Sequence, residues 1–209
     1  LTTLGTTSFC PSMPLGCYGN GGACFTNDDT IAEKIKAIKN YGSTEPFNYK
    51  YIGLNSRLDT IQASILLEKL NYFDESIENR INKAQYYTEN LDFLKTQGFI
   101  LPVVNEDNTS VWAQYSILAL SKMQRDSIVE FLKKYKNIDT TIFYPSPLHL
   151  QNCFSYLNYN KQSLPVTEEI CNRVFNIPIY AEISREDQDY VIDSLKGFSP
   201  FIKKKFIKF

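Results

Sequence analysis

The chain has 209 residues, of which 43% are hydrophobic and 22% are charged, and its formal net charge is -1. These values are typical of a globular protein with one substantial domain or two small ones. A nearly neutral chain creates no general electric field that would attract nucleic acid or an acidic membrane, so we expect neither class of partner.

Residues 6–26 predict a strand, a turn and a second strand. β-Branched and aromatic residues fill positions 6–10, two prolines interrupt the run, and positions 23–26 resume it. Four glycines lie between the strands, at positions 16, 19, 21 and 22. Glycine lets the backbone take positive φ angles and approach a neighbouring group closely. The pattern of a phosphate-binding loop is missing, so the spacing alone favours a glycine-rich hairpin.

A helix is predicted over residues 27–41, capped by Asn27 or Asp28 and ended by Gly42. A polar, aromatic loop over residues 43–51 follows it. This order places one short helix and one loop between the hairpin and the next long element.

The longest predicted helix begins within residues 53–59, where Ser56 and Asp59 resemble a capping box, and it carries apolar residues at helical spacing up to Ala84. We expect one break near residues 71–74. A long helix with a single apolar stripe commonly connects two domains, so we expect this one to link an N-terminal part to a C-terminal part.

Asn55 and Arg57 lie at the predicted start of that helix. Free N–H groups and the helix dipole favour an anion there, and an amide and a guanidinium add directed donors. A capped helix with a solvated arginine explains the same residues without a ligand.

Helices and short strands alternate after residue 111, which predicts a small α+β domain. His149, the only histidine, lies in the sequence Pro-Leu-His-Leu-Gln and has no serine or cysteine partner at a recognisable spacing, so no catalytic triad is inferred. The expected elements are a strand over 111–120, a helix from a Ser121–Gln124 capping box to Lys136, a strand over 138–144, a helix over 165–176, a strand over 177–180, and a final helix capped by Ser184 and Asp187 and closed by Gly197.

The five cysteines predict reduced thiols in a cytosolic protein. Cys10, Cys17 and Cys24 recur at even spacing, but no histidine or acidic ligands accompany them, so a zinc site is not expected. Cys153 and Cys171 are isolated in the sequence. No signal peptide and no apolar run long enough for a bilayer are recognisable, in agreement with a cytoplasmic location.

Two motifs resemble the DegT-like sugar aminotransferases, which are fold-type I enzymes that use pyridoxal phosphate to aminate keto-sugars attached to nucleotides. Residues 8–28 resemble the turn around their cofactor lysine, and residues 53–57 match their Gly-x-Asn-x-Arg pattern, although Leu54 replaces a common aromatic residue. The matching residues of the turn are Ser8-Phe9, Leu15-Gly16, Gly21-Gly22-Ala23 and Thr26-Asn27-Asp28.

The resemblance implies roles for four side chains. Ser8 would donate to the cofactor phosphate within its own subunit, and Asn55 would reach the cofactor phosphate of a neighbouring subunit. Arg57 and His149 would lie near the substrate. The implied partners are therefore a nucleotide-sugar substrate and a second subunit.

The resemblance also implies an α/β and α+β organisation over nearly the whole chain. Residues 1–95 would be the end of a fold-type I large domain together with the linking helix. Residues 96–198 would form a small C-terminal α+β domain. Residues 199–209 would be a basic tail, for which a frayed, solvated terminus is the expectation. Most of the large domain would precede residue 1, and with it the partners of the pyridine nitrogen and part of the phosphate cup.

Met13 occupies the position that the lysine has in the resembled family. That lysine bonds to the cofactor aldehyde as an imine and then moves a proton between substrate and cofactor. A thioether has no basic nitrogen, so Met13 can do neither, although its length lets the turn fold unchanged. No catalytic residue is therefore assigned, and we do not expect this chain to bind pyridoxal phosphate firmly.

Two hypotheses of different classes remain open. The chain is either a sugar-nucleotide aminotransferase by descent that is inactive in this form, or a non-catalytic dimerisation or interaction module derived from that family. In both cases we expect a homo-oligomer or a separate N-terminal half as the protein partner.

Overall fold

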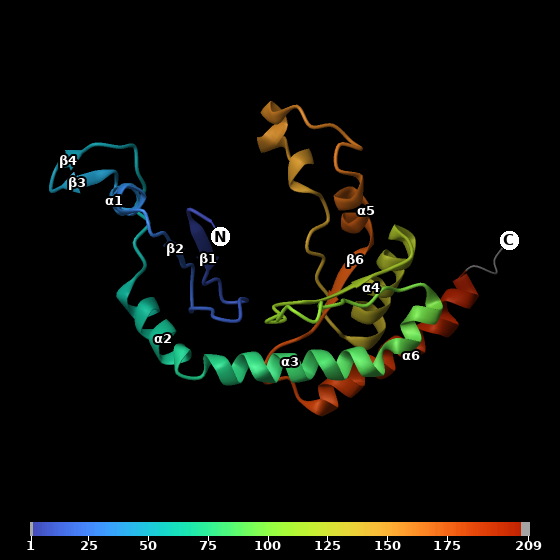
Figure 1. The fold of residues 1–209 in the computed structure, drawn as a ribbon. Helices are drawn as coiled ribbons and strands as arrows, with labels where there is room; N and C mark the ends of the chain where they lie inside the picture. The colour runs from blue at the N-terminus through green and yellow to red at the C-terminus, as the bar shows by residue number, and fades with distance from the viewer. Residues whose placement is uncertain (1, 206–209) are drawn as a thin grey trace. The chain divides into compact units, whose positions relative to one another are not determined.

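The computed structural model describes residues 2–205, with side chains described for residues 2–198. The chain divides into two compact units, Leu1–Ser76 and Ile77–Phe209 (Figure 1). The sequence-based boundary between residues 95 and 96 lies later in the chain. The difference arises because Ala84 and Tyr87 are fully buried in the core of the second unit, so the helix that carries them belongs mainly to that unit.

Two hairpins form the sheets of the N-terminal unit. β1 (Gly5–Ser8) pairs antiparallel with β2 (Gly22–Phe25), as the predicted strand, turn and strand require. β3 (Ser43–Glu45) pairs with β4 (Asn48–Tyr49) where a loop was predicted, so that prediction was wrong. A two-residue turn joins the second pair, and Phe47 takes a positive φ of 64° in it, which lets such short strands pair.

The first helix, α1 (Asp29–Ile38), begins where the sequence predicts. The side chain of Asp28 accepts a hydrogen bond from the Ile31 N–H, which confirms Asp28 as the cap. Gly42 follows the helix with a φ of 81°. That left-handed conformation favours glycine and explains why the chain turns away at this point.

The predicted long helix is two helices, α2 (Thr60–Leu70) and α3 (Phe73–Asn90), and the predicted break is confirmed. The predicted start was wrong, because α2 begins at Thr60 and Ser56 caps nothing. The Ser56 N–H instead donates to the Lys39 carbonyl, which holds this segment against the end of α1.

The C-terminal unit contains one antiparallel sheet and three longer helices besides α3, within the part of the chain that the structure describes. A 3-10 helix, η1 (Asp92–Gln97), follows α3, and two more lie between α4 and α5. The remaining elements are β5 (Tyr115–Leu118), α4 (Lys122–Lys136), η2 (Leu148–Leu150), η3 (Asn152–Leu157), α5 (Pro165–Arg173), β6 (Val174–Ile177) and α6 (Arg185–Lys205).

Several predicted elements of this unit differ from the structure. The strand predicted over residues 111–120 covers only Tyr115–Leu118, and the helix predicted over residues 165–176 ends at Arg173, where β6 begins. Residues 138–144 form only an isolated bridge between Thr141 and Asn176 instead of a strand. The last strand ends at Ile177 rather than beginning there, because Pro178 has no N–H to continue the ladder. α6 continues through Gly197, whose added Cβ would meet nothing within 4 Å, to Lys205. Of the predicted basic tail, residues 206–209 lie outside the described residues.

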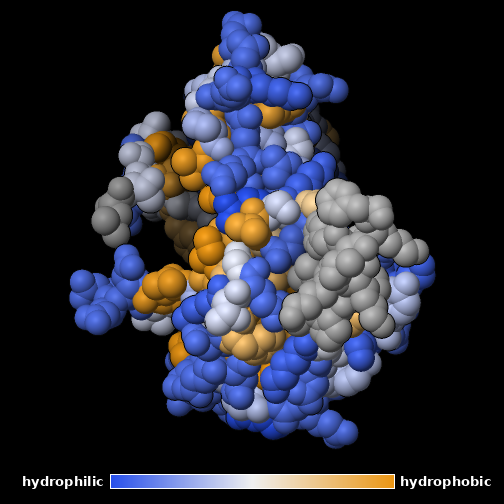
Figure 2. All heavy atoms as spheres, turned by 90° about the vertical axis from the view of Figure 1, so that its right-hand side faces the viewer, coloured by the Kyte–Doolittle hydropathy of each residue, from blue (hydrophilic) through white to orange (hydrophobic). Residues whose placement is uncertain are grey.

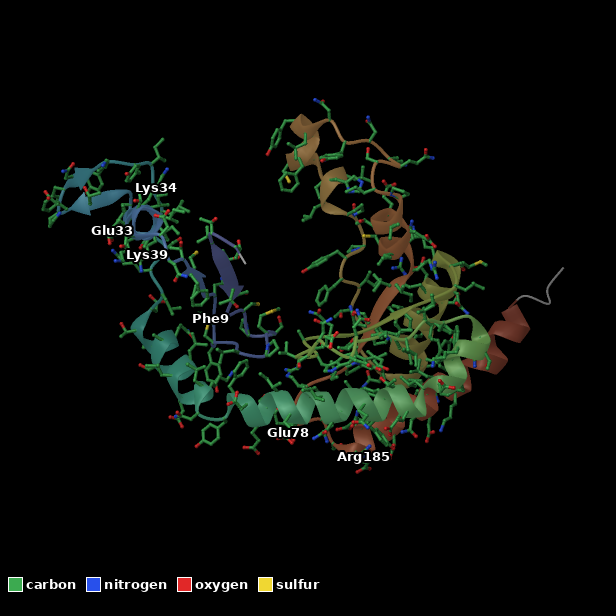
Figure 3. All side chains as sticks on the ribbon, in the orientation of Figure 1. Phe9, Glu33, Lys34, Lys39, Glu78 and Arg185 are labelled. Carbon is green, nitrogen blue, oxygen red and sulfur yellow. The ribbon has the colours of Figure 1, made fainter. Side chains whose placement is uncertain are left out.

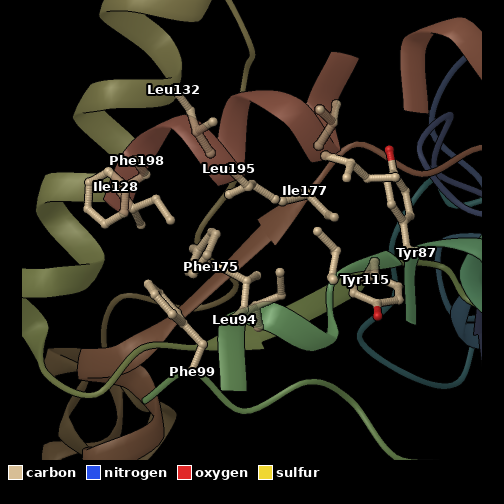
Figure 4. Packing of buried hydrophobic residues seen from close by; sticks show 14 of the residues in the cluster. Tyr87, Leu94, Phe99, Tyr115, Ile128, Leu132, Phe175, Ile177, Leu195 and Phe198 are labelled. Atoms are coloured by element: carbon tan, nitrogen blue, oxygen red, sulfur yellow. The ribbon is translucent and has the colours of Figure 1, made fainter. Parts of the chain in front are cut away.

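The core of the C-terminal unit lies between the sheet and the helices (Figure 4). Phe175 of β6 and Tyr115 of β5 are completely buried, and Leu132 of α4 and Leu195 of α6 close over them. Burial of these side chains removes apolar area from water, which is the main driving force for folding. On the face shown in Figure 2, hydrophobic side chains also reach the surface between hydrophilic ones. None of the described helices is long and apolar enough to cross a membrane.

The N-terminal unit leaves much of its apolar surface uncovered, so we expect the chain to associate. Only Cys17, Ala37 and Leu66 are buried hydrophobic residues in its described part, whereas Phe47 is 90% exposed and Ile52 is fully exposed. Burying such surface gains roughly 25 cal/mol for each Å². Light scattering at micromolar concentration should therefore show dimers or larger species.

Replacement of Phe47 and Ile52 together by serine should shift that distribution toward the monomer. The matched control replaces the polar, exposed Lys50 and Thr44 by serine and should leave the distribution unchanged. A monodisperse wild-type monomer that does not bind a hydrophobic dye would contradict this expectation.

Candidate functional site

The turn between β1 and β2 is closed by backbone hydrogen bonds. The Phe9 N–H donates to the Gly21 carbonyl, and the Cys17 N–H donates to the Phe9 carbonyl, both at 2.9 Å. Phe9 is therefore the first residue of the turn, directly after β1 (Figure 3). Inside this frame the Met13 N–H donates to the Cys10 carbonyl at 2.8 Å, which makes a tight inner turn.

Gly16 shows why this turn needs glycine. A Cβ added there would lie 2.7 Å from the Cys10 carbonyl oxygen and 2.8 Å from that of Pro11. The two segments therefore pack closer than any side chain permits. Two side chains of α2 hold the turn from outside: Gln62 accepts from the Tyr18 N–H at 2.8 Å, and Lys69 Nζ donates to the Gly16 carbonyl at 2.6 Å.

The structure places Ser8 at the end of β1 and Met13 in the turn that follows it. Ser8 Oγ is exposed and accepts from the Cys10 N–H at 3.2 Å, so its own O–H remains available to donate to an anion. Met13 is half-buried. Hydrogen bonds from the backbone and then the side chain of Ser12 hold the pKa of the Cys10 thiol below its ordinary value. The sequence alone did not predict this contact of Cys10 with Ser12, because it depends on how the turn folds.

Asn55 and Arg57 lie beside the end of α1 rather than at a helix start. Asn55 forms an isolated bridge with Asn40, and an Arg57 guanidinium nitrogen donates to Asn40 Oδ1 at 2.6 Å. The Arg57 guanidinium also lies 5.4 Å from the centre of the Tyr41 ring. The helix-dipole argument for an anion at these residues was therefore wrong, since α2 begins at Thr60.

The Asn55 side chain is exposed and makes no hydrogen bond within the described chain, so its amide can serve an external partner. Among the described contacts, none joins Asn55 or Arg57 to Ser8 or Met13. The structure therefore shows two separate groups of expected site residues in the N-terminal unit.

His149 lies in the C-terminal unit, where it is buried on η2. Its Nε2 is 3.1 Å from Glu168 Oε1. The Gln162 N–H donates to both Glu168 oxygens, at 2.8 and 3.0 Å, and the Leu164 N–H donates to Oε1 at 3.4 Å. These hydrogen bonds hold the pKa of Glu168 below its ordinary value. The bond from the Gln162 N–H has the largest effect, and the bond from His149 also contributes.

One carboxylate thus joins η2, the following loop and α5. These three segments, together with residues 143–147 and η3, line a cavity of about 900 Å³. Sequence reasoning found His149 but missed Glu168, because the two residues are 19 positions apart and only the fold brings them together. The cavity is lined by Phe143, Tyr144, Pro145, Ser146, Pro147, Leu148, His149, Gln151, Phe154, Leu157, Tyr159, Leu164, Thr167, Ile170 and Cys171.

The profile of the DegT/DnrJ/EryC1/StrS aminotransferase family matches residues 1–196. The chain belongs to this family. The resemblance seen in the two sequence motifs is thereby confirmed. The match covers both structural units and nearly all of the described chain.

Named relatives and a solved structure of the family support this assignment. The chain is 39% identical to a UDP-2-acetamido-2-deoxy-3-oxo-D-glucuronate aminotransferase of Pseudomonas aeruginosa, with 86% of this chain and 47% of the relative covered. It is 37% identical to a dTDP-3-amino-3,4,6-trideoxy-alpha-D-glucose transaminase of Micromonospora megalomicea, with 90% and 50% covered. The structure of NtdA from Bacillus subtilis with bound cofactor PMP has a TM-score of 0.78, 28% identity, and coverage of 94% and 46%.

The chain spans about half the length of the relatives that it matches. Its mixed helix-and-sheet structure agrees with the aminotransferase fold of the family. Pyridoxal phosphate is the cofactor that the family implies. The turn fits it only in part, because Ser8 offers a hydroxyl donor while Met13 offers no amine. The amine of Lys69 is already hydrogen-bonded to the Gly16 carbonyl.

Proposed function

We propose that this chain is a member of the DegT/DnrJ/EryC1/StrS family that derives from sugar-nucleotide aminotransferases and does not itself catalyse transamination. The proposal is supported by Met13, which by the motif of residues 8–28 takes the position of the family lysine. Bonded through an imine, pyridoxal phosphate supplies the electron sink for transamination. Met13 cannot make that bond, so this chain lacks the amine on which transamination depends.

The other expected residues keep roles that do not require an amine. Ser8 is proposed to donate its O–H to a phosphate group, and Asn55 to offer its free amide to a phosphate from a second subunit. Arg57 and His149 are proposed to contact a nucleotide-linked sugar. The names of the two relatives, which act on UDP- and dTDP-linked sugars, support a pyrimidine nucleotide as the carrier.

The two structural units are proposed to correspond to parts of the family fold. The N-terminal unit corresponds to the end of the cofactor domain with its motif turn. The C-terminal unit corresponds to the small domain. The remaining half of the relatives' length would then be supplied by another stretch of polypeptide or by a partner chain.

The purified chain should form no covalent adduct with pyridoxal phosphate at the turn. Mixing the two should give no visible absorption of a protonated imine from this site, and borohydride reduction should leave the peptide of residues 8–22 unmodified. Exposed lysines such as Lys39 serve as the internal background in the same digest. A stable adduct mapped to residues 8–22 would disprove the proposal.

The exposed apolar surface of the N-terminal unit favours a second candidate function, a non-catalytic interaction module. Phe47 and Ile52 lie in or next to the β3–β4 hairpin and are almost wholly exposed. Light scattering of the wild type and of the Phe47, Ile52 double variant tests this candidate, because a chain that stays monomeric would offer no support for it.

A further inference from the structure

Asn20 lies in the turn between β1 and β2, and it is the only asparagine of the sequence that glycine follows. Asn20 is exposed, and its side chain forms no hydrogen bond within the part of the chain that the structure describes. Because glycine has no Cβ, the Gly21 nitrogen can approach the side-chain carbonyl carbon of Asn20 without steric hindrance. The two residues therefore have the groups needed to close a five-membered ring.

The backbone of Gly21 is held at its carbonyl and free at its nitrogen. The carbonyl accepts from the Phe9 N–H at 2.9 Å, whereas the Gly21 N–H has no hydrogen-bond partner among the described residues. An N–H without such a partner loses its proton to solvent base more readily than a protected one. The pair Asn55 and Ser56 is also exposed, but there the following N–H donates to the Lys39 carbonyl at 2.9 Å. The fold therefore leaves the first pair reactive and protects the second.

We propose that Asn20 is a site of spontaneous covalent modification, at which cyclisation with Gly21 replaces the side-chain amide. The Gly21 nitrogen attacks the side-chain carbonyl carbon of Asn20, so one C–N bond forms and the C–N bond to the amide nitrogen breaks. That nitrogen leaves as ammonia with the proton that the Gly21 N–H gave up, and a succinimide ring remains. Water then opens the ring at either of its carbonyl groups, which gives aspartate or isoaspartate without any oxidant or reductant.

The isoaspartate product lengthens the backbone by one methylene group where the turn is closely packed. A Cβ added at Gly21 would lie 3.0 Å from Leu58 Cδ1 and 3.1 Å from Cys17 Sγ. The carbonyl just before Asn20 accepts from the Cys17 thiol at 3.1 Å, so the chain is held on that side as well. An extra methylene group and a carboxylate therefore displace Gly21. The hydrogen bond from the Phe9 N–H to the Gly21 carbonyl breaks, and the turn between β1 and β2 loosens.

Storage of the full 209-residue chain in mildly alkaline buffer, followed by peptide mapping, tests the proposal. In the folded chain Asn20 should convert at least about tenfold faster than Asn55, because the Ser56 N–H must first lose its hydrogen bond. In strong denaturant the rate at Asn20 should change little, whereas the rate at Asn55 should rise because its protection is gone. The matched control Asn20→Gln keeps an amide at this position but must close a larger ring, so it should stay unmodified there.

Hydrogen exchange at the Phe9 amide measures the structural effect of the modification. Chains with isoaspartate at position 20 should lose protection there, whereas freshly purified Asn20→Asp, which has the charge without the extra backbone atom, should keep it. An Asn20 that stays intact in the folded chain and converts only in denaturant would overturn the proposed site. Unchanged protection of Phe9 in the isoaspartate chain would overturn the loosening of the turn. Neither measurement uses pyridoxal phosphate, so both are independent of the adduct test at Met13.

Discussion

Replacing Met13 with lysine should give the chain a borohydride-stable adduct with pyridoxal phosphate in the peptide of residues 8–22. The two side chains are similar in length, and the inner turn is fixed by the hydrogen bond from the Met13 N–H to the Cys10 carbonyl. The new amine would therefore project from the position proposed to correspond to the family lysine, in the turn that follows Ser8. Reduction followed by peptide mapping measures the change from no adduct in the wild type to an adduct in the variant.

The matched control is Ser12→Lys, which puts a lysine on the neighbouring, exposed position of the same turn. Any exposed amine reacts reversibly with an aldehyde, so this variant reports the background. Met13→Lys should exceed it several-fold if the turn positions the cofactor. Equal labelling of the two variants would show that the turn does not direct the side chain at position 13 toward a bound cofactor. That result would contradict the role proposed for Met13.

Gly42→Ala should unfold the β3–β4 hairpin from the rest of the N-terminal unit. Gly42 has a φ of 81°, and an added Cβ would lie 1.6 Å from the Tyr51 carbonyl oxygen. Its own carbonyl accepts from the N–H groups of Lys50 and Tyr51, and its N–H donates to Ala37. Strain and the loss of these bonds should together cost about 3 kcal/mol or more. Hydrogen exchange of the hairpin amides measures the loss of protection.

Gly197→Ala is the matched control, because the same chemical change occurs inside α6 with nothing within 4 Å of the new Cβ. There alanine should stabilise the helix by about 0.5–1 kcal/mol, since glycine loses more backbone entropy on folding. Unchanged exchange of the β3–β4 amides in Gly42→Ala would mean that the close approach of Gly42 to Tyr51 does not hold the hairpin.

Helix caps show what local sequence determines in this protein. Ser121 accepts from the Gln124 N–H, and Ser184 accepts from the Asp187 N–H, as the sequence predicts. Gln124 itself accepts from the Leu120 N–H, one residue before the cap. Such bonds link residues a few positions apart, so the sequence alone predicts them without knowledge of the fold. The hairpin that carries Ser8 on its first strand and Met13 in its turn was predictable for the same reason.

Contacts between distant segments were decided only by the tertiary structure. Ser56 and Asp59 have a capping pattern, yet the segment before α2 pairs with Asn40 and the end of α1, which moves the helix start to Thr60. The pairing of Arg57 with Asn40 follows from the same long-range contact.

The Glu168–His149 contact shows the same limit at the second candidate site. A glutamate on α5 and a histidine on η2 each fit an ordinary surface pattern, and nothing local links them. Residue types and short spacings therefore determined the family, the motif turn and several helix caps. Which segments approach one another decided the sites around Asn40 and Glu168, because side-chain partners across a fold depend on packing of the whole unit rather than on sequence neighbours.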